Sequence, residues 1–371
     1  LSLIFTNVIS YFQISLLSLK LVTAYPLILM TLVQVGISAV WVFICQSFYR
    51  QLFPPRKLLL ISGNRPIEDI LHKFESRRDK YEVVRCVREE LGQKALEQEI
   101  LERYDGIVLW DINTGLRNKL LKFCYSRSIR VYMMPKIPDI MIQGASQLHL
   151  FDTPILFTRE YSMTVEQRFV KRAIDIICSL ILIIITSPIM IITAVIIKCY
   201  DHGPVLYKQV RCTRNMEEFK IVKFRSMRTD AEKDGVARLA SKNDDRITPI
   251  GKFIRKVRID ELPQLFNILK GEMSFVGPRP ERQEIAEKYE EIVPEFRFRL
   301  KVKAGLTGYA QVYGKYNTTP YDKLKLDLTY IQTDSAWLDV KLMLMTFKIM
   351  FQKENTEGVD EKQTTAIKKE S

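Results

Sequence analysis

The sequence predicts a membrane protein that joins α-helical membrane segments to α/β and α+β domains. Its uncharged residues gather in three long blocks, at 1–19, 21–49 and 176–197. Between the second and third blocks, residues 56–160 alternate apolar strand-like segments with charged helical ones. The polar remainder carries an acidic pair among many cations. A chain of 371 residues is long enough for about two domains besides its membrane segments.

The first two blocks predict transmembrane helices over residues 1–50. The second block exceeds the roughly 20 apolar residues that span a bilayer, whereas the first is less apolar. A basic flank follows the second block and places its end on the cytoplasmic side, at Arg50, Arg56 and Lys57. A buried soluble helical hairpin is the alternative. Because the chain opens on an already apolar Leu1, we expect the set of helices to be incomplete.

Residues 56–160 predict a Rossmann-like domain. Apolar strands are expected at 58–62, 81–84, 106–110 and 129–133, and the helices between them favour a parallel sheet. The first turn reads Ser-Gly-Asn-Arg and lacks the GxGxxG fingerprint of dinucleotide sites. Nucleotide binding is therefore weakly indicated, and a regulatory or spacer role is the alternative.

The third block predicts a re-entrant membrane helix over residues 172–198. Ser187-Pro188 interrupts it, and each half reaches only roughly 15–18 Å, against a hydrocarbon core of about 30 Å. Basic residues flank both ends and favour the cytoplasmic face, namely Arg168, Lys171 and Arg172 before, and Lys198, Lys208 and Arg211 after. A kinked spanning helix is the alternative.

Two further segments have amphipathic helical patterns, at 247–259 and 337–351. Such basic amphipathic helices are typical of the membrane interface, and core packing is the alternative. The polar tail, residues 359–371, is predicted to be disordered.

The acidic pair Asp260-Glu261 follows a basic run at 252–258 and precedes a rigid Gly-Pro-Arg-Pro turn at 277–280. Carboxylates among cations suit chemistry on a phosphate ester. The alternative is that Asp260 merely caps a helix, whose apolar stripe then ends at Gly271.

Composition excludes several other functions. The net charge of +13 fits phosphorylated substrates or an anionic membrane surface. A nucleic-acid partner is not expected, because the basic clusters flank apolar segments rather than interleave with aromatics. Six cysteines without metal spacing and three scattered histidines argue against a zinc or histidine cluster. Adjacent carboxylates do not fit a two-carboxylate glycosidase.

A series of ordered motifs covers the second half of the chain. They are KRAID at 171–175, GPVLYKQVR at 203–211, FKIVKFRSM at 219–227, the stretch 246–280, KAGLTGYAQVYGK at 303–315 and WLDVK at 337–341. With these motifs, residues 166–358 resemble the bacterial sugar transferases, the polyprenyl-phosphate glycosyl-1-phosphate transferases. The front half looks like their larger polytopic members. Departures at Cys212-Thr213 and Ala304 lie away from the acidic pair.

The resemblance implies a membrane-embedded α+β catalytic domain at 166–358 behind a CoA-binding-like regulatory domain at 56–160. It implies a multi-pass protein of the bacterial cell membrane whose catalytic domain is cytoplasmic. The reaction would transfer a sugar 1-phosphate from a UDP-sugar to undecaprenyl phosphate and release UMP, starting an exopolysaccharide, capsule or O-antigen-type glycan. Asp260 would be the nucleophile, forming a covalent phosphosugar-aspartate. Both Asp260 and Glu261 would serve as Mg²⁺ ligands.

The same resemblance assigns further residues. Those expected to bind the substrate phosphates or the nucleotide are Lys223, Arg225, Arg258, Arg279 and Thr307. Those expected to form the membrane re-entrant motif are Lys171, Arg172, Asp175, Ser187 and Pro188, with Asp175 paired to Lys171. For Arg279 an ion pair with Glu272 or Glu281 is the alternative.

Some questions stay open on the sequence alone. The sugar is not identified, and neither is a homodimer. The rival function is a catalytically silent, membrane-anchored nucleotide-binding regulator of polysaccharide synthesis.

Overall fold

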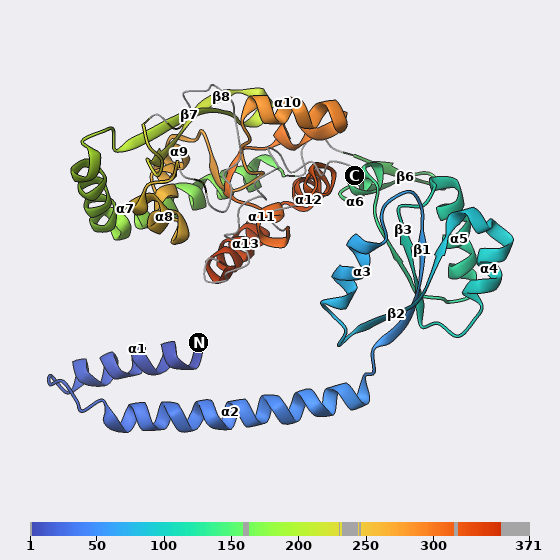
Figure 1. Ribbon diagram of the computed structural model, residues 1–371, viewed down its shortest axis with the longest axis horizontal. Coiled ribbons are helices and arrows are strands. Elements are labelled where there is room, and N and C mark those ends of the chain that lie inside the picture. Colours follow the sequence, from blue (N-terminus) through green and yellow to red (C-terminus); the bar gives the residue numbers. More distant parts are fainter. Residues whose placement is uncertain are drawn as a thin grey trace. The chain divides into compact units, whose positions relative to one another are not determined.

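The computed structural model describes residues 2–158, 163–229, 231, 244, 246–314 and 318–349 (Figure 1). Its contacts divide the chain into two compact units, Leu1–Met134 and Pro135–Ser371. The predicted disordered tail lies outside the described residues.

Two apolar helices open the first unit, α1 (Ser2–Leu17) and α2 (Tyr25–Leu52). None of the α2 side chains is buried, and by length and composition the helix can cross a membrane. The Asn7 amide of α1 donates to Thr31 Oγ1 at 2.9 Å and to Gln34 Oε1 at 2.8 Å in α2. Such side-chain bonds satisfy polar groups that lipid cannot.

A parallel four-stranded sheet follows, as the sequence predicts. Its order is β2-β1-β3-β4. The strands are β1 (Arg56–Ser62), β2 (Tyr81–Arg88), β3 (Gly106–Trp110) and β4 (Val131–Met133), and the helices are α3 (Glu68–Glu75), α4 (Gln93–Ile100) and α5 (Thr114–Ser126), with a 3₁₀ turn η1 (Glu89–Leu91). Alternate β1 residues pack into separate cores, Leu59 and Ile61 into one, Leu58 and Leu60 into the other. The central strand is thus apolar throughout because both faces are covered.

The second unit begins earlier than the predicted domain boundary at residue 160. It opens with α6 (Ile137–Gln143) and the hairpin β5 (Ser146–Leu150) and β6 (Thr153–Phe157). Ile137 and Ile140 of α6 are buried in the same core as Leu324 and Leu328 of α12 (Pro320–Thr333). This packing joins residues 135–158 to the part of the chain that follows them.

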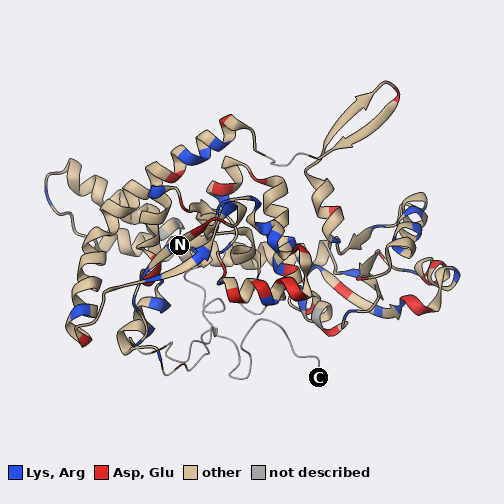
Figure 2. Ribbon diagram, turned by 90° about the horizontal axis from the view of Figure 1, so that it is seen from above, with Lys and Arg blue, Asp and Glu red and all other residues tan. Residues whose placement is uncertain are grey.

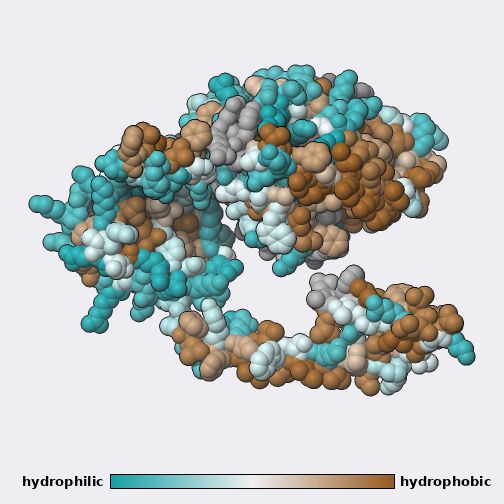
Figure 3. All heavy atoms as spheres, turned by 180° about the vertical axis from the view of Figure 1, so that it is seen from behind, coloured by the Kyte–Doolittle hydropathy of each residue, from teal (hydrophilic) through white to brown (hydrophobic). Residues whose placement is uncertain are grey.

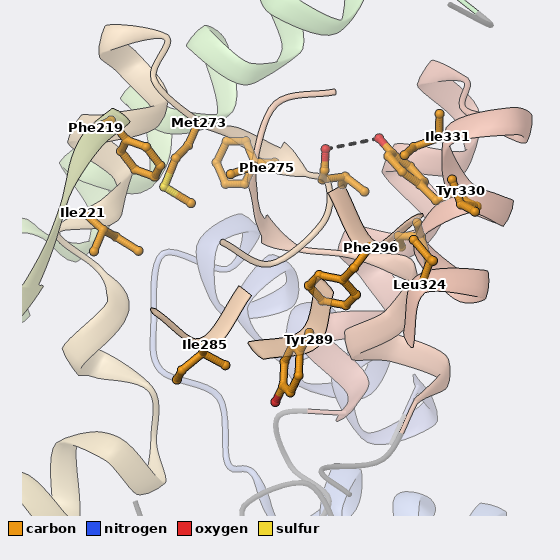
Figure 4. Packing of buried hydrophobic residues seen from close by; sticks show 14 of the residues in the cluster. Phe219, Ile221, Met273, Phe275, Ile285, Tyr289, Phe296, Leu324, Tyr330 and Ile331 are labelled. Atoms are coloured by element: carbon orange, nitrogen blue, oxygen red, sulfur yellow. Dashed lines mark hydrogen bonds between the residues drawn. The ribbon is translucent and has the colours of Figure 1, made fainter. Parts of the chain in front are cut away.

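The rest of the second unit is an α+β arrangement. Its elements are α7 (Val165–Asp201), β7 (Leu206–Cys212), η2 (Arg214–Met216), β8 (Glu218–Phe224), α8 (Pro249–Lys256), η3 (Ile259–Glu261), α9 (Gln264–Lys270), β9 (Ser274–Val276), α10 (Gln283–Ile292), η4 (Pro294–Lys301), β10 (Gly305–Thr307), α11 (Tyr309–Tyr313) and α13 (Ala336–Ile349). Strands β7 and β8 pair antiparallel, and β9 and β10 pair parallel. Figure 4 shows the core that they share, with Phe275 of β9, Phe296 of η4 and Tyr330 of α12 among its rings.

The 37-residue helix α7 continues through Pro188. Proline has no N–H to donate to the carbonyl of Ile184, four residues earlier. The Ser187 hydroxyl donates to that carbonyl instead, at 2.9 Å. Figure 1 shows the helix changing direction between its two halves, as helices do at proline. The predicted re-entrant path stays a prediction.

Helix α7 is the second candidate membrane span among the described residues. In Figure 2 charged residues are dense over the compact parts of the molecule, and long uncharged stretches mark the extended helices. The amphipathic α8 and α13 each bury one face and expose large apolar residues, Phe253 in α8 and Trp337 and Phe347 in α13. Their predicted place in the membrane interface likewise stays a prediction.

Candidate active site

The acidic pair lies on a short 3₁₀ turn between two helices. Thr248 caps α8 by accepting from the Gly251 N–H at 2.9 Å. The chain leaves α8 through Arg258, whose φ of 56° is left-handed and uncommon for a residue with a side chain. Such strained conformations cluster at functional sites. Helix α9 begins only at Gln264, with Pro263 as its N-cap, so Asp260 does not cap it.

Glu261 is held by three cations. Its Oε1 accepts from Arg279 Nη2 at 2.7 Å and from Lys223 Nζ at 3.2 Å, and its Oε2 lies 3.6 Å from Arg258 Nη1. Burial disfavours the charged form, but the three cations outweigh it and hold the pKa of Glu261 well below its usual range. In return, the charge of Glu261 raises the pKa of Arg279. Glu261 is therefore a permanent anion that gathers the cations of the site.

Asp260 has a different environment from its neighbour. Among the described residues, its carboxylate has no hydrogen-bond or ion-pair partner. Burial, and next the charge of Glu261, raise its pKa to about 6. It is thus mostly ionised at neutral pH yet more basic than an ordinary aspartate. An unpaired, partly buried carboxylate of raised basicity beside cations is suited to attack on an anionic phosphorus centre.

Lys223 reaches Glu261 because α9 clamps its strand. The Asn267 side chain of α9 accepts from the Val222 N–H at 3.0 Å and donates to the Lys220 carbonyl at 2.9 Å. Both bonds lie in β8 just before Lys223. Burial lowers the pKa of Lys223, and the charge of Glu261 opposes that shift.

The Gly-Pro-Arg-Pro turn is fixed by two arginines. Arg299 donates to the carbonyl of Arg279 at 2.9 Å, and Arg211 donates to that of Pro280 at 3.1 Å. Gly277 begins the turn where a Cβ would lie 2.2 Å from the Lys303 carbonyl. The backbone is thereby set so that the Arg279 guanidinium extends to Glu261, rather than to Glu272 or Glu281.

A protein-family model matches the part of the chain that contains this site. The model described as bacterial sugar transferase matches residues 166–353. The chain belongs to the bacterial sugar transferase family.

Several curated relatives are enzymes of this family. The chain is 37% identical over 255 residues to the UDP-N-acetylgalactosamine-undecaprenyl-phosphate N-acetylgalactosaminephosphotransferase of Aeromonas hydrophila, covering 66% of this chain and 59% of the relative. It is 40% identical over 210 residues to the UDP-glucose:undecaprenyl-phosphate glucose-1-phosphate transferase of Klebsiella pneumoniae, covering 55% and 43%. It is 32% identical over 285 residues to the undecaprenyl-phosphate galactose phosphotransferase of Salmonella typhimurium, covering 67% and 58%. The chain spans about half the length of these relatives.

Two residues that the sugar transferase resemblance assigns to the phosphates lie elsewhere. Arg225 forms an ion pair with Asp201 at the end of α7, and its Nε and Nη1 have no partner in the described part of the chain. The Thr307 hydroxyl lies 2.5 Å from that of Thr346 in α13. Of the five predicted phosphate-binding residues, Lys223, Arg258 and Arg279 meet at Glu261.

The predicted membrane motif ties α7 to the rest of the second unit. Arg172 donates at 2.7 Å to the carbonyls of Ile268 and Leu269, the last turn of α9. Asp175 is buried and accepts from the Ser274 hydroxyl at 3.1 Å and the Phe275 N–H at 3.0 Å.

Lys171 also has partners other than the expected Asp175. It pairs with Asp339, and it donates to the Tyr330 hydroxyl at 3.0 Å and the Val276 carbonyl at 3.1 Å. Tyr330 donates to the same carbonyl at 3.1 Å. A dashed line in Figure 4 marks a hydrogen bond of Tyr330. The base of the helix is therefore bound to β9, which leads directly into the Arg279 turn.

Sequence reasoning missed the residues that position the site. The sequence positions of Asn267 and Arg299 do not associate either residue with the predicted site. The signal for Arg299 lies in buried charge, since it is 3% exposed and pairs with the equally buried Asp327 at 2.8 Å. Charged residues at apolar helix positions, as in α12, are the pattern that could have found it.

The donor set limits how Mg²⁺ could bind. No group of three metal-ligating side chains occurs in the described ranges. Both oxygens of Glu261 face cations, whereas the Asp260 carboxylate is unpaired. Mg²⁺ typically takes one or two carboxylates and completes its shell with water and substrate phosphates. The site fits such an ion held through Asp260 better than one held by both carboxylates.

Proposed function

We propose that this protein transfers a sugar 1-phosphate from a UDP-sugar to undecaprenyl phosphate, releasing UMP and starting a lipid-linked glycan. The family and the names of the relatives support the reaction class. The observation that carries the mechanism is the unequal pair, with Glu261 locked to cations and Asp260 unpaired with a pKa of about 6.

In the first half of the proposed reaction, an Asp260 oxygen attacks the phosphorus that bears the sugar. The bond from that phosphorus to the bridging oxygen breaks, and UMP leaves with the electron pair. The product is a phosphosugar-aspartate. Lys223 and Arg279 stand beside the reacting phosphate and stabilise its negative charge. Bound Mg²⁺ would supply further charge neutralisation on the diphosphate.

In the second half, an oxygen of undecaprenyl phosphate attacks the same phosphorus. The bond to the Asp260 oxygen breaks, and the carboxylate is restored. The product is undecaprenyl diphospho-sugar. Glu261 keeps the cations in place through both halves, because its partners hold it ionised.

Helix α7 fits a re-entrant path on the cytoplasmic face of the bacterial cell membrane. Thirty-seven residues extend about 55 Å when straight. Yet Arg172 near its start and Asp201 at its end both bond to the catalytic unit. A folded unit lies on one side of a bilayer, so a helix bound to it at both ends must return to that side. Helix α2 is long and apolar enough to add a membrane span of its own.

The covalent step is tested by intact mass without lipid acceptor. Purified protein in nanodiscs is mixed with Mg²⁺ and, separately, with UDP-glucose, UDP-galactose and UDP-N-acetylgalactosamine. We expect a sugar-phosphate adduct on Asp260 with one donor, lost in Asp260→Asn and kept in the control Asp152→Asn on the exposed β5–β6 turn. No adduct with any donor, and no UMP after adding undecaprenyl phosphate, would instead favour the silent regulator.

A further inference from the structure

An apolar groove lies between the second half of α7 and helix α8. Its volume is about 580 Å³, within the roughly 300–1,000 Å³ of ligand pockets. It is lined by Ile189, Ile192, Thr193 and Ile196 of α7, Pro249, Ile250, Phe253 and Ile254 of α8, and Ile259. Figure 3 shows a broad hydrophobic surface over this part of the second unit.

The lining excludes a polar ligand. Its one polar side chain, Thr193, donates to the Ile189 carbonyl of its own helix at 2.8 Å. Among the residues that the structure describes, no charged side chain lines the groove. A nucleotide or a sugar would lose its hydrogen bonds with water there and gain none. The occupant must therefore be a hydrocarbon chain.

The position of the groove points to one hydrocarbon. Ile259 lines it and directly precedes Asp260. Arg255 near the end of α8 lies close enough for its charge to act on Asp260. A ligand with an apolar tail in the groove and an anionic head would therefore place the head near Arg255 and Asp260.

We infer that the groove binds the proximal polyprenyl chain of the acceptor and so delivers its phosphate to Asp260. This rests on the proposed function. The groove gives the second half-reaction its own binding site, separate from the cations around Glu261 that face the donor. Damage to it should therefore affect acceptor use and spare the donor step.

Neighbouring isoleucines of α7 provide matched variants. Ile192 lines the groove and Ile191 does not, although both are well exposed, at 59% and 64%. Ile196 and Val195 form a second pair, at 45% and 55%. Tryptophan at 192 or 196 fills the groove, whereas tryptophan at 191 or 195 faces away from it.

Steady-state kinetics in nanodiscs then separate the two halves. We expect Ile192→Trp and Ile196→Trp to raise the KM for undecaprenyl phosphate roughly tenfold or more, as a misfit in an apolar pocket does. Adduct formation without acceptor should stay at the wild-type rate. Ile191→Trp and Val195→Trp should match the wild type in both. Equal KM values within each pair would overturn the inference.

Photo-crosslinking tests the groove without catalysis. Polyprenyl phosphate with a diazirine in its first isoprene units should label peptides covering 189–196 and 249–259. Unlabelled undecaprenyl phosphate should compete, and phosphatidylglycerol should not. Labelling elsewhere, or equal competition by phosphatidylglycerol, would overturn the proposal. Labelling here by a protein that forms no adduct and releases no UMP would refute the proposed reaction and leave the groove as a polyprenyl-binding site.

Discussion

Arg279 Nη2 and Lys223 Nζ share one oxygen of Glu261, at 2.7 and 3.2 Å. Lys223 lies in strand β8, and Arg279 lies in the turn after β9. The Glu261 carboxylate therefore holds these two elements together. Two positive groups so close repel each other unless an anion lies between them. Glu261 thus allows the site to concentrate positive charge beside Asp260, as the proposed attack on a diphosphate requires.

Replacing Arg279 should disable the donor step. In Arg279→Gln the charge beside the reacting phosphate is lost, and we expect adduct formation to slow by roughly 10²–10³-fold, as for other lost transition-state donors. Lys288→Gln, on the exposed face of α10, should match the wild type. The readout is the rate of adduct formation by rapid-quench mass spectrometry. A variant as fast as Lys288→Gln would remove Arg279 from the mechanism.

The rate should follow the ionisation of Asp260. Its pKa of about 6 is raised by burial and by Glu261. Only the ionised carboxylate attacks, so adduct formation should decline as pH falls through about 6. Glu261→Gln removes the neighbouring negative charge and leaves the cations, and it should move this acid limb downward by on the order of one pH unit. A limb that stays in place would mean that another group controls it.

The same carboxylate should cost stability. A raised carboxyl pKa means that the folded state disfavours the ionised form, so the penalty is absent below the unfolded pKa of about 4 and complete above about 6. We expect Asp260→Asn to stabilise the protein by roughly 2–3 kcal/mol at pH 8 and by much less near pH 4. Thermal unfolding in nanodiscs at the two pH values measures this. Equal effects at both would contradict the pKa assignment.

The sequence predicts the parallel sheet well, because the run of Leu58 to Ile61 is apolar on both faces. It predicts the end of that domain poorly. Ile137 and Ile140 read like a continuation, yet they pack against α12, nearly two hundred residues later. The spacing of apolar residues predicts that a helix is buried, but it does not predict which element the helix packs against. Only the structure could therefore assign α6 to the second unit.

The candidate site, too, could be predicted only in part from the sequence. Asp260 and Glu261 stand out as neighbours among cations, and Lys223 and Arg279 could be added through the family motifs. Their convergence on Glu261 is a long-range contact that spacing cannot show. Arg225 is two residues from Lys223 in the same motif, but the direction of its side chain leads it to Asp201. Nothing in the sequence distinguishes Asn267 from other helix residues. Its role depends on its contacts with β8, which only the structure shows.

The path of α7 can be tested by labelling its ends. Cysteine at Gln167, before the apolar stretch, and native Cys199, after it, are placed one at a time in a background with the other cysteines replaced. With a re-entrant helix, a membrane-impermeant maleimide should label both in inside-out vesicles and neither in sealed right-side-out cells. Opposite labelling of the two sites would establish a spanning helix. Pro188→Ala restores a backbone donor and should favour that straight form.

The buried pair of Lys171 and Asp339 is the last contact to test. The two side chains are only 17% and 5% exposed, and they join the base of α7 to α13. Removing one partner leaves an uncompensated buried charge, so Lys171→Met or Asp339→Leu alone should destabilise the protein by roughly 3–5 kcal/mol.

The double variant, Lys171→Met with Asp339→Leu, leaves no unpaired charge and should recover much of that loss. Thermal unfolding of all four proteins gives the coupling energy between the two residues. Lys288→Met serves as a control for the loss of an exposed lysine. Additive losses in the double variant would show that the two charges act independently, and that α7 is held by Arg172 and Asp175 without this pair.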